Sequence, residues 1–193
     1  MSESQQKIII LDRDGVINFD SPEYIKSPEE WLPIPGSIEA IAELSKQGFH
    51  VYLATNQSGI GRKLFSMLTF AEINQKLIRQ VEELDGEIQG IFFCPHTPDD
   101  NCDCRKPKPG LLDEIFAASE TNPLACPVVG DSRRDLEAAI SAGCLPILVR
   151  SGNGSKTLHG LTADPLQGFD NNDIFDDLAD AAEQLLSEEK RRK

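Results

Sequence analysis

Short apolar runs alternate with amphipathic segments along most of the chain. Five runs, each apolar and too short for a buried helix, predict strands at residues 7–11, 49–55, 90–94, 126–131 and 145–149. Apolar residues at helical spacing predict helices at residues 35–48, 69–84, 109–119, 135–142 and within 173–189. Thr69 and Glu72 have the spacing of a capping box for the second helix. The final residues, KRRK, are expected to form a frayed tail.

This alternation implies right-handed crossovers and a mainly parallel sheet with helices on both faces. We therefore predict an α/β fold, a Rossmann-like three-layer sandwich, formed by residues 1–193 as a single domain. Ligands of such sheets bind beyond the carboxyl ends of the strands. Polar residues gather at those places, in the stretches LDRDG, ATNQSG, CPH and VGD. No long insertion follows the first or second stretch, so we expect no large cap domain and a rather open site.

The net charge of −13 argues against binding to nucleic acid or to anionic membrane surfaces. An anionic substrate would need a local basic site. No apolar run is long enough to span a bilayer, and the polar start, MSESQQK, lacks an apolar signal core. We expect a cytoplasmic protein, in which clustered cysteines bind metal more often than they form disulfides, and a monomer.

Three carboxylates follow two of the predicted strands. Asp12 and Asp14 come directly after the first strand, and Asp131 ends the fourth strand at the same edge of the sheet. Asp and Gly are also common in turns, so the first pair alone would not identify a site. Together the three predict a magnesium site of hard oxygen ligands. Asp135 lies four residues further on, where it would either support this site or favour the start of a helix.

Such a site suits phosphoryl transfer. A carboxylate nucleophile is already ionised at neutral pH, and Mg²⁺ removes its repulsion from an anionic phosphate. The Thr55 hydroxyl and the Lys106 ammonium group could hold the phosphoryl oxygens. Taken singly, Thr55 fits a strand-end turn and Lys106 fits a solvated surface lysine, but both fit a phosphate site beside the carboxylates.

Soft metal ligands gather in residues 94–104. Cys94, His96, Cys102 and Cys104 form a full tetrahedral set for Zn²⁺, and the alternative is a group of reduced, uncoordinated thiols. Four protein ligands leave no open position for water, so the zinc should be structural. This zinc loop ends where Arg105 and Lys106 begin and should fix their direction.

The stretches DRDG, TNQSG, RKPKPG and GDSRRD resemble, in order, the four motifs of the haloacid dehalogenase superfamily. The resemblance implies that Asp12 is a nucleophile that forms an aspartyl-phosphate. It implies that Asp14 is the acid for the leaving oxygen and then the base for water. Thr55 and Lys106 would hold the phosphoryl group. Mg²⁺ would bind to Asp12, to the backbone carbonyl of Asp14 and to Asp131.

Within that superfamily, DRDGVIN, TNQSGIGR, the zinc loop and CRKPKPG resemble the heptose-1,7-bisphosphate 7-phosphatases. That family removes the C7 phosphate of D-glycero-D-manno-heptose 1,7-bisphosphate during synthesis of nucleotide-activated heptose for lipopolysaccharide. The residues that the resemblance places against the phosphorylated sugar are Arg13, Asp20, Ser21, Pro22, Glu23, Asn56, Gln57, Ser58 and Arg105. One position differs, because members often carry a lysine where this chain has Ser132, next to Arg133.

Two alternatives remain open. Histidinol-phosphate phosphatases have a similar zinc loop but a cationic substrate. Arg62, Lys63 and Arg105 favour the anionic bisphosphate, whereas Asp20 and Glu23 could favour the cationic substrate. A non-enzymatic zinc-binding interaction module is the more remote alternative, and it would show no Mg²⁺-dependent turnover.

Overall fold

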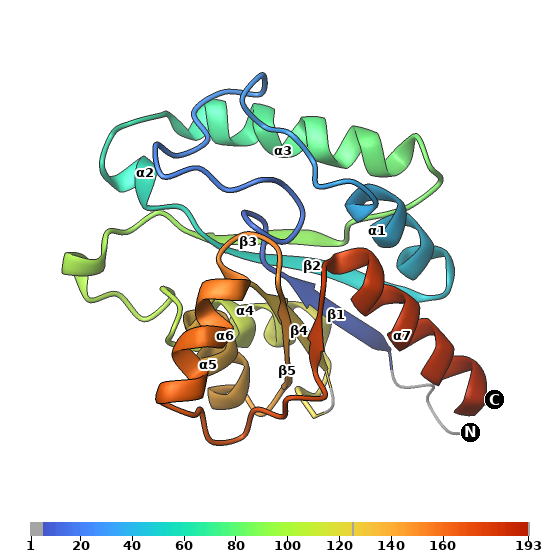
Figure 1. Ribbon diagram of the computed structural model, residues 1–193. Coiled ribbons are helices and arrows are strands. Elements are labelled where there is room, and N and C mark those ends of the chain that lie inside the picture. The colour runs from blue at the N-terminus through green and yellow to red at the C-terminus, as the bar shows by residue number, and fades with distance from the viewer. Residues whose placement is uncertain (1–5, 125, 193) are drawn as a thin grey trace.

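The computed structural model describes residues 6–124 and 126–192, which form a six-stranded sheet with the order β3-β2-β1-β4-β5-β6 (Figure 1). All strand pairs are parallel. The strands are β1 (Lys7–Leu11), β2 (Phe49–Asn56), β3 (Gly90–Cys94), β4 (Pro127–Gly130), β5 (Leu145–Val149) and β6 (Ile174–Phe175). The five predicted strands are confirmed to within a residue at each end, and β6 was not predicted.

The described helices are α1 (Ser37–Lys46), α2 (Ser58–Gly61), α3 (Met67–Glu82), α4 (Gly110–Ser119), α5 (Arg133–Ser141), α6 (Gly154–Ala163) and α7 (Leu178–Arg192), with a 3₁₀ turn at Pro98–Asp100. The sequence did not predict α2 and α6. The expected capping box of α3 is wrong, because Ser66 is the cap and its hydroxyl accepts from Thr69 N at 3.0 Å. The expected frayed tail is also wrong as far as Arg192, which still belongs to α7; Lys193 lies outside the described residues.

The alternation of β1 divides the core into two layers. Ile9 and Leu11 pack with the buried residues of α1, α3 and α7, whereas Ile8 and Ile10 pack with those of α4 and α5. Figure 1 shows these two groups of helices on opposite sides of the sheet. The predicted three-layer sandwich is confirmed.

The parallel strands bring distant parts of the chain to one edge of the sheet. Leu11 of β1 pairs with Leu53 of β2 and with Val129 of β4, so the residues that follow each strand emerge side by side. Residues 12–36 form the loop between β1 and α1, and α2 and α3 lie between β2 and β3. Neither segment adds a second sheet, which agrees with the expected lack of a large cap domain for the described residues. None of the described helices combines the length and apolar character needed to cross a membrane.

Candidate active site

The carboxyl ends of β1, β2 and β4 border a cavity of about 290 Å³. Most residues predicted for the site line it: Asp12, Asp14, Asp20, Ser21, Pro22, Thr55, Asn56, Gln57, Ser58, Arg105, Lys106 and Asp131. Two predicted residues, Arg13 and Glu23, are not among its lining residues. The structure therefore brings the four motifs together although they are spread over more than a hundred residues of sequence.

Lys106 is a buried cation between two carboxylates. Only 3% of its side chain is exposed, and its Nζ lies 3.0 Å from Asp12 Oδ1 and 2.5 Å from Asp135 Oδ1. The same nitrogen donates to the backbone oxygen of Ala54 at 2.7 Å. Burial alone would lower the pKa of Lys106, but Asp12 and Asp135 outweigh it and raise this pKa above the ordinary value. Lys106 is therefore a fixed positive charge at the cavity wall and not a solvated surface lysine.

Asn56 holds the backbone of Lys106. Its Nδ2 donates to Lys106 O at 3.0 Å, and its Oδ1 accepts from Lys106 N at 3.1 Å. Both polar atoms of the amide therefore have a partner across 50 residues of sequence. Asn56 borders the cavity, but both of its side-chain hydrogen bonds are made to the backbone of Lys106.

The carboxylate of Asp14 is surrounded by donors. Gln57 Nε2 donates to it at 2.7 Å, Asn18 Nδ2 at 2.9 Å, and the Arg13 guanidinium at 3.1 and 3.2 Å. Burial raises the pKa of Asp14, but the Arg13 charge and these hydrogen bonds outweigh it and hold the pKa below its usual range. Gln57 Nε2 also donates to the Thr55 hydroxyl at 2.9 Å, so one amide links Asp14 with Thr55.

The placement of Arg13 corrects one prediction. Its side chain is fully buried, donates to Asn74 Oδ1 at 3.2 Å and lies over the ring of Phe70. Arg13 is fully buried, whereas Asp12 and Asp14 on either side of it line the cavity. A fully buried side chain does not fit the expected contact of Arg13 with substrate. Its position fits the hydrogen bonds that it donates to the Asp14 carboxylate.

Carboxylate oxygens of Asp12, Asp131 and Asp135 lie within 4.8 Å of one another and could hold a metal ion. Asp135 is already engaged by Lys106 and by the backbone N and hydroxyl of Ser132. Burial raises the pKa of Asp12 to about 6 and that of Asp131 to about 7, and neighbouring carboxylates add to both shifts. Anionic oxygens crowded in this way fit a hard divalent cation such as Mg²⁺.

Gly15 leaves room for the Asp131 carboxylate. It has a φ of +88°, and a Cβ at this position would lie 2.1 Å from Asp131 Oδ2. The same oxygen accepts a hydrogen bond from Asn153 N at 2.7 Å. The glycine of the first motif therefore permits the close approach of β1 and β4 side chains that forms the acidic cluster.

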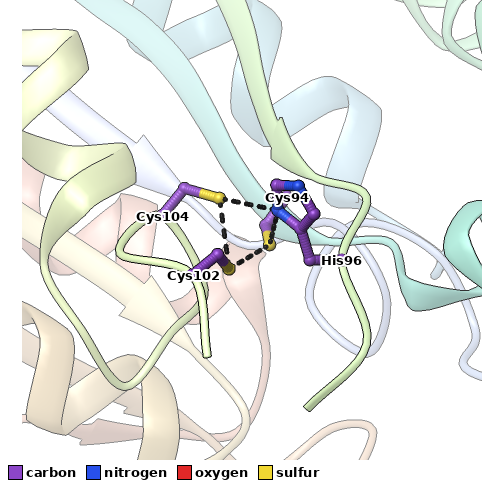
Figure 2. A group of neighbouring side chains, drawn as sticks. All are labelled: Cys94, His96, Cys102 and Cys104. Carbon is purple, nitrogen blue, oxygen red and sulfur yellow. Dashed lines mark hydrogen bonds between the residues drawn. The ribbon is translucent and has the colours of Figure 1, made fainter. Parts of the chain in front are cut away.

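The four predicted zinc ligands converge at the end of β3 (Figure 2). Cys94 and Cys102 sulfurs are 3.5 Å apart, Cys102 and Cys104 sulfurs are 3.5 Å apart, and His96 Nδ1 lies 3.3 Å from Cys104 and 3.6 Å from Cys94. Zn–S bonds of about 2.3 Å and Zn–N bonds of about 2.0 Å in a tetrahedron imply S···S separations of about 3.8 Å and N···S separations of about 3.5 Å. The observed separations lie within about 0.3 Å of these values and are far too long for a disulfide.

Two residues at the cavity, Arg134 and Asn153, were not predicted. Arg62, which was expected from the sequence to favour an anionic substrate, also lines it, whereas Arg133 points away and pairs with Glu137 and Asp164. Asn153 follows β5, so the strand-end rule that found Asp131 would also have found it. The choice between Arg133 and Arg134 depends on the rotation of α5, for which the sequence carries no signal.

Comparisons with known proteins agree with this geometry. A family model described as polynucleotide kinase 3 phosphatase matches residues 7–134, and a HAD-hydrolase-like model matches residues 103–181. D-glycero-beta-D-manno-heptose-1,7-bisphosphate 7-phosphatase of Bordetella bronchiseptica is 48% identical over 184 residues, which are 94% of this chain and 99% of the relative. The same-named protein of Pseudomonas putida is 49% identical over 181 residues, or 93% and 99% of the two chains.

Solved structures point to the same family. A D,D-heptose 1,7-bisphosphate phosphatase from B. bronchiseptica, crystallised with magnesium and phosphate, matches with a TM-score of 0.89 at 48% identity, covering 94% of this chain and 99% of that one. The corresponding structure from Burkholderia thailandensis matches with a TM-score of 0.72 at 40% identity and the same coverage. The chain belongs to the heptose-1,7-bisphosphate 7-phosphatase family of HAD-like hydrolases.

Proposed function

We propose that this protein is a Mg²⁺-dependent phosphatase that removes the C7 phosphate of D-glycero-D-manno-heptose 1,7-bisphosphate. One observation carries the proposal: Asp12, Asp14, Asp131, Thr55 and Lys106 line the same cavity of about 290 Å³ at the carboxyl edge of the sheet. The names of the relatives support the substrate and the reaction, and a place in the synthesis of nucleotide-activated heptose is a further part of the proposal.

Asp12 is the proposed nucleophile. Its carboxylate oxygen attacks phosphorus and forms an aspartyl-phosphate while the bond from phosphorus to the sugar oxygen breaks. The fixed charge of Lys106, 3.0 Å from Asp12 Oδ1, and the Thr55 hydroxyl lie where they can bind phosphoryl oxygens. A bound Mg²⁺ would neutralise charge between carboxylate and phosphate, and the groups proposed to hold it are Asp12, the Asp14 carbonyl and Asp131.

Asp14 is the proposed acid and base. It gives a proton to the leaving sugar oxygen, and then takes a proton from the water that hydrolyses the aspartyl-phosphate. Gln57 and Arg13 orient its carboxylate. Their hydrogen bonds favour the ionised form of Asp14, which is the form needed to take a proton from water in the second half of the reaction. The first half needs a protonated Asp14, and the negative charge of a substrate phosphate bound nearby would favour that form.

A structural zinc in the loop at residues 94–104 is a further part of the proposal. The ligand separations support it. Purified protein should contain one equivalent of zinc by elemental analysis. Cys102→Ala should lose most of that zinc and lower the Tm, whereas Cys126→Ala, which changes a buried cysteine outside the loop, should keep it. Retention of zinc by the Cys102 variant would disprove the ligand set.

The bisphosphate is favoured over histidinol phosphate by the arginines at the cavity. Arg62, Arg105 and Arg134 line it, while Glu23, which could favour a cationic substrate, does not. Asp20 does line it, but its Oδ2 accepts from Asn153 Nδ2 at 3.0 Å and its Oδ1 accepts from Ser21 N. Both carboxylate oxygens of Asp20 therefore already accept hydrogen bonds from within the protein.

Phosphate release tests the function directly. With Mg²⁺, the protein should hydrolyse the heptose bisphosphate much faster than histidinol phosphate, and the opposite ranking would disprove the assignment. Asp12→Asn should abolish turnover, and Asp113→Asn, the same change at an exposed site on α4, should not. No Mg²⁺-dependent release from either substrate would leave the non-enzymatic zinc module as the better reading.

The physical state of the protein is also a proposal. We infer that residues 1–193 act as one domain, that the protein is monomeric, and that it works in the cytoplasm. Sedimentation at several protein concentrations tests whether the protein is monomeric, and fractionation of cells tests whether it lies in the cytoplasm. Limited proteolysis that yields two stable fragments would contradict the single domain.

A further inference from the structure

Three arginines that line the cavity, Arg62, Arg105 and Arg134, have no carboxylate partner among the described residues, and two of them, Arg105 and Arg134, also border a second cavity. Within the described part of the chain, the exposed side chain of Arg134 has neither a hydrogen bond nor an ion pair, and Arg105 makes one bond, at 3.2 Å, to a backbone oxygen of the zinc loop. By contrast, Arg13, Arg133 and Arg150 each pair with a carboxylate. In a chain with a net charge of −13, guanidinium groups that stay unpaired beside a cavity are placed to bind an anion from outside.

These two arginines stand between two adjoining cavities. The catalytic cavity of about 290 Å³ and a neighbour of about 270 Å³ share Pro98, Arg105, Lys106 and Arg134 in their walls. The second cavity extends along the zinc loop as far as Lys108. A substrate bound to Asp12 through one end can therefore extend past Arg105 and Arg134 with the other.

Both arginines are carried by well-fixed segments. Arg105 directly follows the zinc ligand Cys104, and Arg134 lies in the first turn of α5, where Asp135 and Ser132 form a capping box. The Ser132 hydroxyl donates to Asp135 and is not free to bind substrate. Arg134 is thus the side chain of this turn that has free donors at the cavity.

The family resemblance already places Arg105 against the phosphorylated sugar. We propose that Arg134 joins Arg105 in a second anion site for the substrate phosphate that is not cleaved, and that Arg134 is a specificity-determining residue. This inference rests on the proposed function and adds to it. Guanidinium groups bind phosphate through paired, charge-assisted hydrogen bonds. The site selects phosphate esters that carry a second anionic group at the far end over esters that carry one phosphate only.

The test compares Arg134→Ala with Arg133→Ala. Both remove one positive charge from the same helical turn, but Arg133 points away from the cavity. Steady-state kinetics with heptose 1,7-bisphosphate and with heptose 7-phosphate should show the effect. Arg134→Ala should raise KM for the bisphosphate about tenfold with little change in kcat, as expected for loss of one charge-assisted phosphate contact. KM for the monophosphate should stay the same, Arg134→Lys should fall in between, and Arg133→Ala should match the unchanged protein.

The outcomes separate this inference from the proposed function. An equal rise in KM for both substrates, or equal effects of the two arginine variants, overturns the second anion site and leaves the phosphatase intact. If the unchanged protein hydrolyses neither sugar, the proposed function fails. Calorimetric titration with the two sugar phosphates then still tests the anion site, and equal affinities for the two would overturn it.

Discussion

Replacement of Asp135 by asparagine should expose how much of the fold depends on the buried pair with Lys106. The two side chains are 2% and 3% exposed, and Asp135 Oδ1 lies 2.5 Å from Lys106 Nζ. Removal of one partner from a buried pair leaves an uncompensated charge, which costs about 3–5 kcal/mol. Asparagine keeps an oxygen for the Ser132 donors, and Asp12 still faces Lys106 Nζ at 3.0 Å, so we expect the lower end of this range, about 3 kcal/mol.

Urea unfolding in the presence of a chelator measures this loss without a contribution from bound metal. For a chain of 193 residues, about 3 kcal/mol corresponds to a fall in Tm of about 6–12 °C. Glu137→Gln is the matched control on the same helix, since it also changes a carboxylate to an amide, but in a partly exposed pair with Arg133. Little change is expected there, because exposed pairs contribute little.

A double-mutant cycle tests the reasoning behind the number. In a Lys106→Met background no buried ammonium group remains, so Asp135→Asn should cost clearly less than it does alone. A loss below about 1 kcal/mol in the single variant, or an equal loss in both backgrounds, would refute the view that the cost comes from the loss of one of the two carboxylate partners of the buried lysine.

Three further outcomes follow from the site. Because the pKa values of Asp12 and Asp131 are raised to about 6 and 7, the metal-free protein should gain stability as pH falls through this range, and Mg²⁺ should raise the Tm more at pH 8 than at pH 5.5. An equal rise in Tm on addition of Mg²⁺ at the two pH values would contradict this. Gly15→Ala, with φ +88° and a clash with Asp131, should destabilise in urea more than Gly48→Ala, with φ +87° and open space. Lys76→Met removes two hydrogen bonds, from Lys76 Nζ to the backbone oxygens of Pro28 and Trp31 in the loop between β1 and α1. The free energy of unfolding in urea should fall by about 1–3 kcal/mol, and an unchanged value would show that other contacts hold this loop.

The sheet was predictable because buried parallel strands leave nearly continuous apolar runs in the sequence. The elements that were missed lack such a signal. In α6 only Gly154 and Leu161 are buried, so its sequence shows little helical periodicity, and β6 has two residues, both half-buried. The start of α3 was misplaced because Ser66 and Thr69 offer the same hydroxyl, and only the observed bond tells which one caps the helix.

The site was predictable in part for a topological reason. Every parallel strand delivers its following residues to one edge, so Asp12, Thr55 and Asp131 could be brought together without knowledge of any distance. Orientation could not be obtained in this way. The inward direction of Arg13 and the free position of Arg134 depend on backbone turns beyond the strand ends, which composition and spacing do not determine.

The loop at residues 94–104 and Lys106 are held by different contacts, although they adjoin in sequence. Lys106 is fixed by Asn56 at its backbone and by Asp12 and Asp135 at its amine, all from outside the zinc loop. Arg105 has one side-chain contact, and that contact is to the backbone of His96 in the loop. Loss of the proposed zinc ion should therefore disturb Arg105 more than Lys106. Under the proposed function, the loop then determines which phosphate ester is bound more than it supports the chemical step.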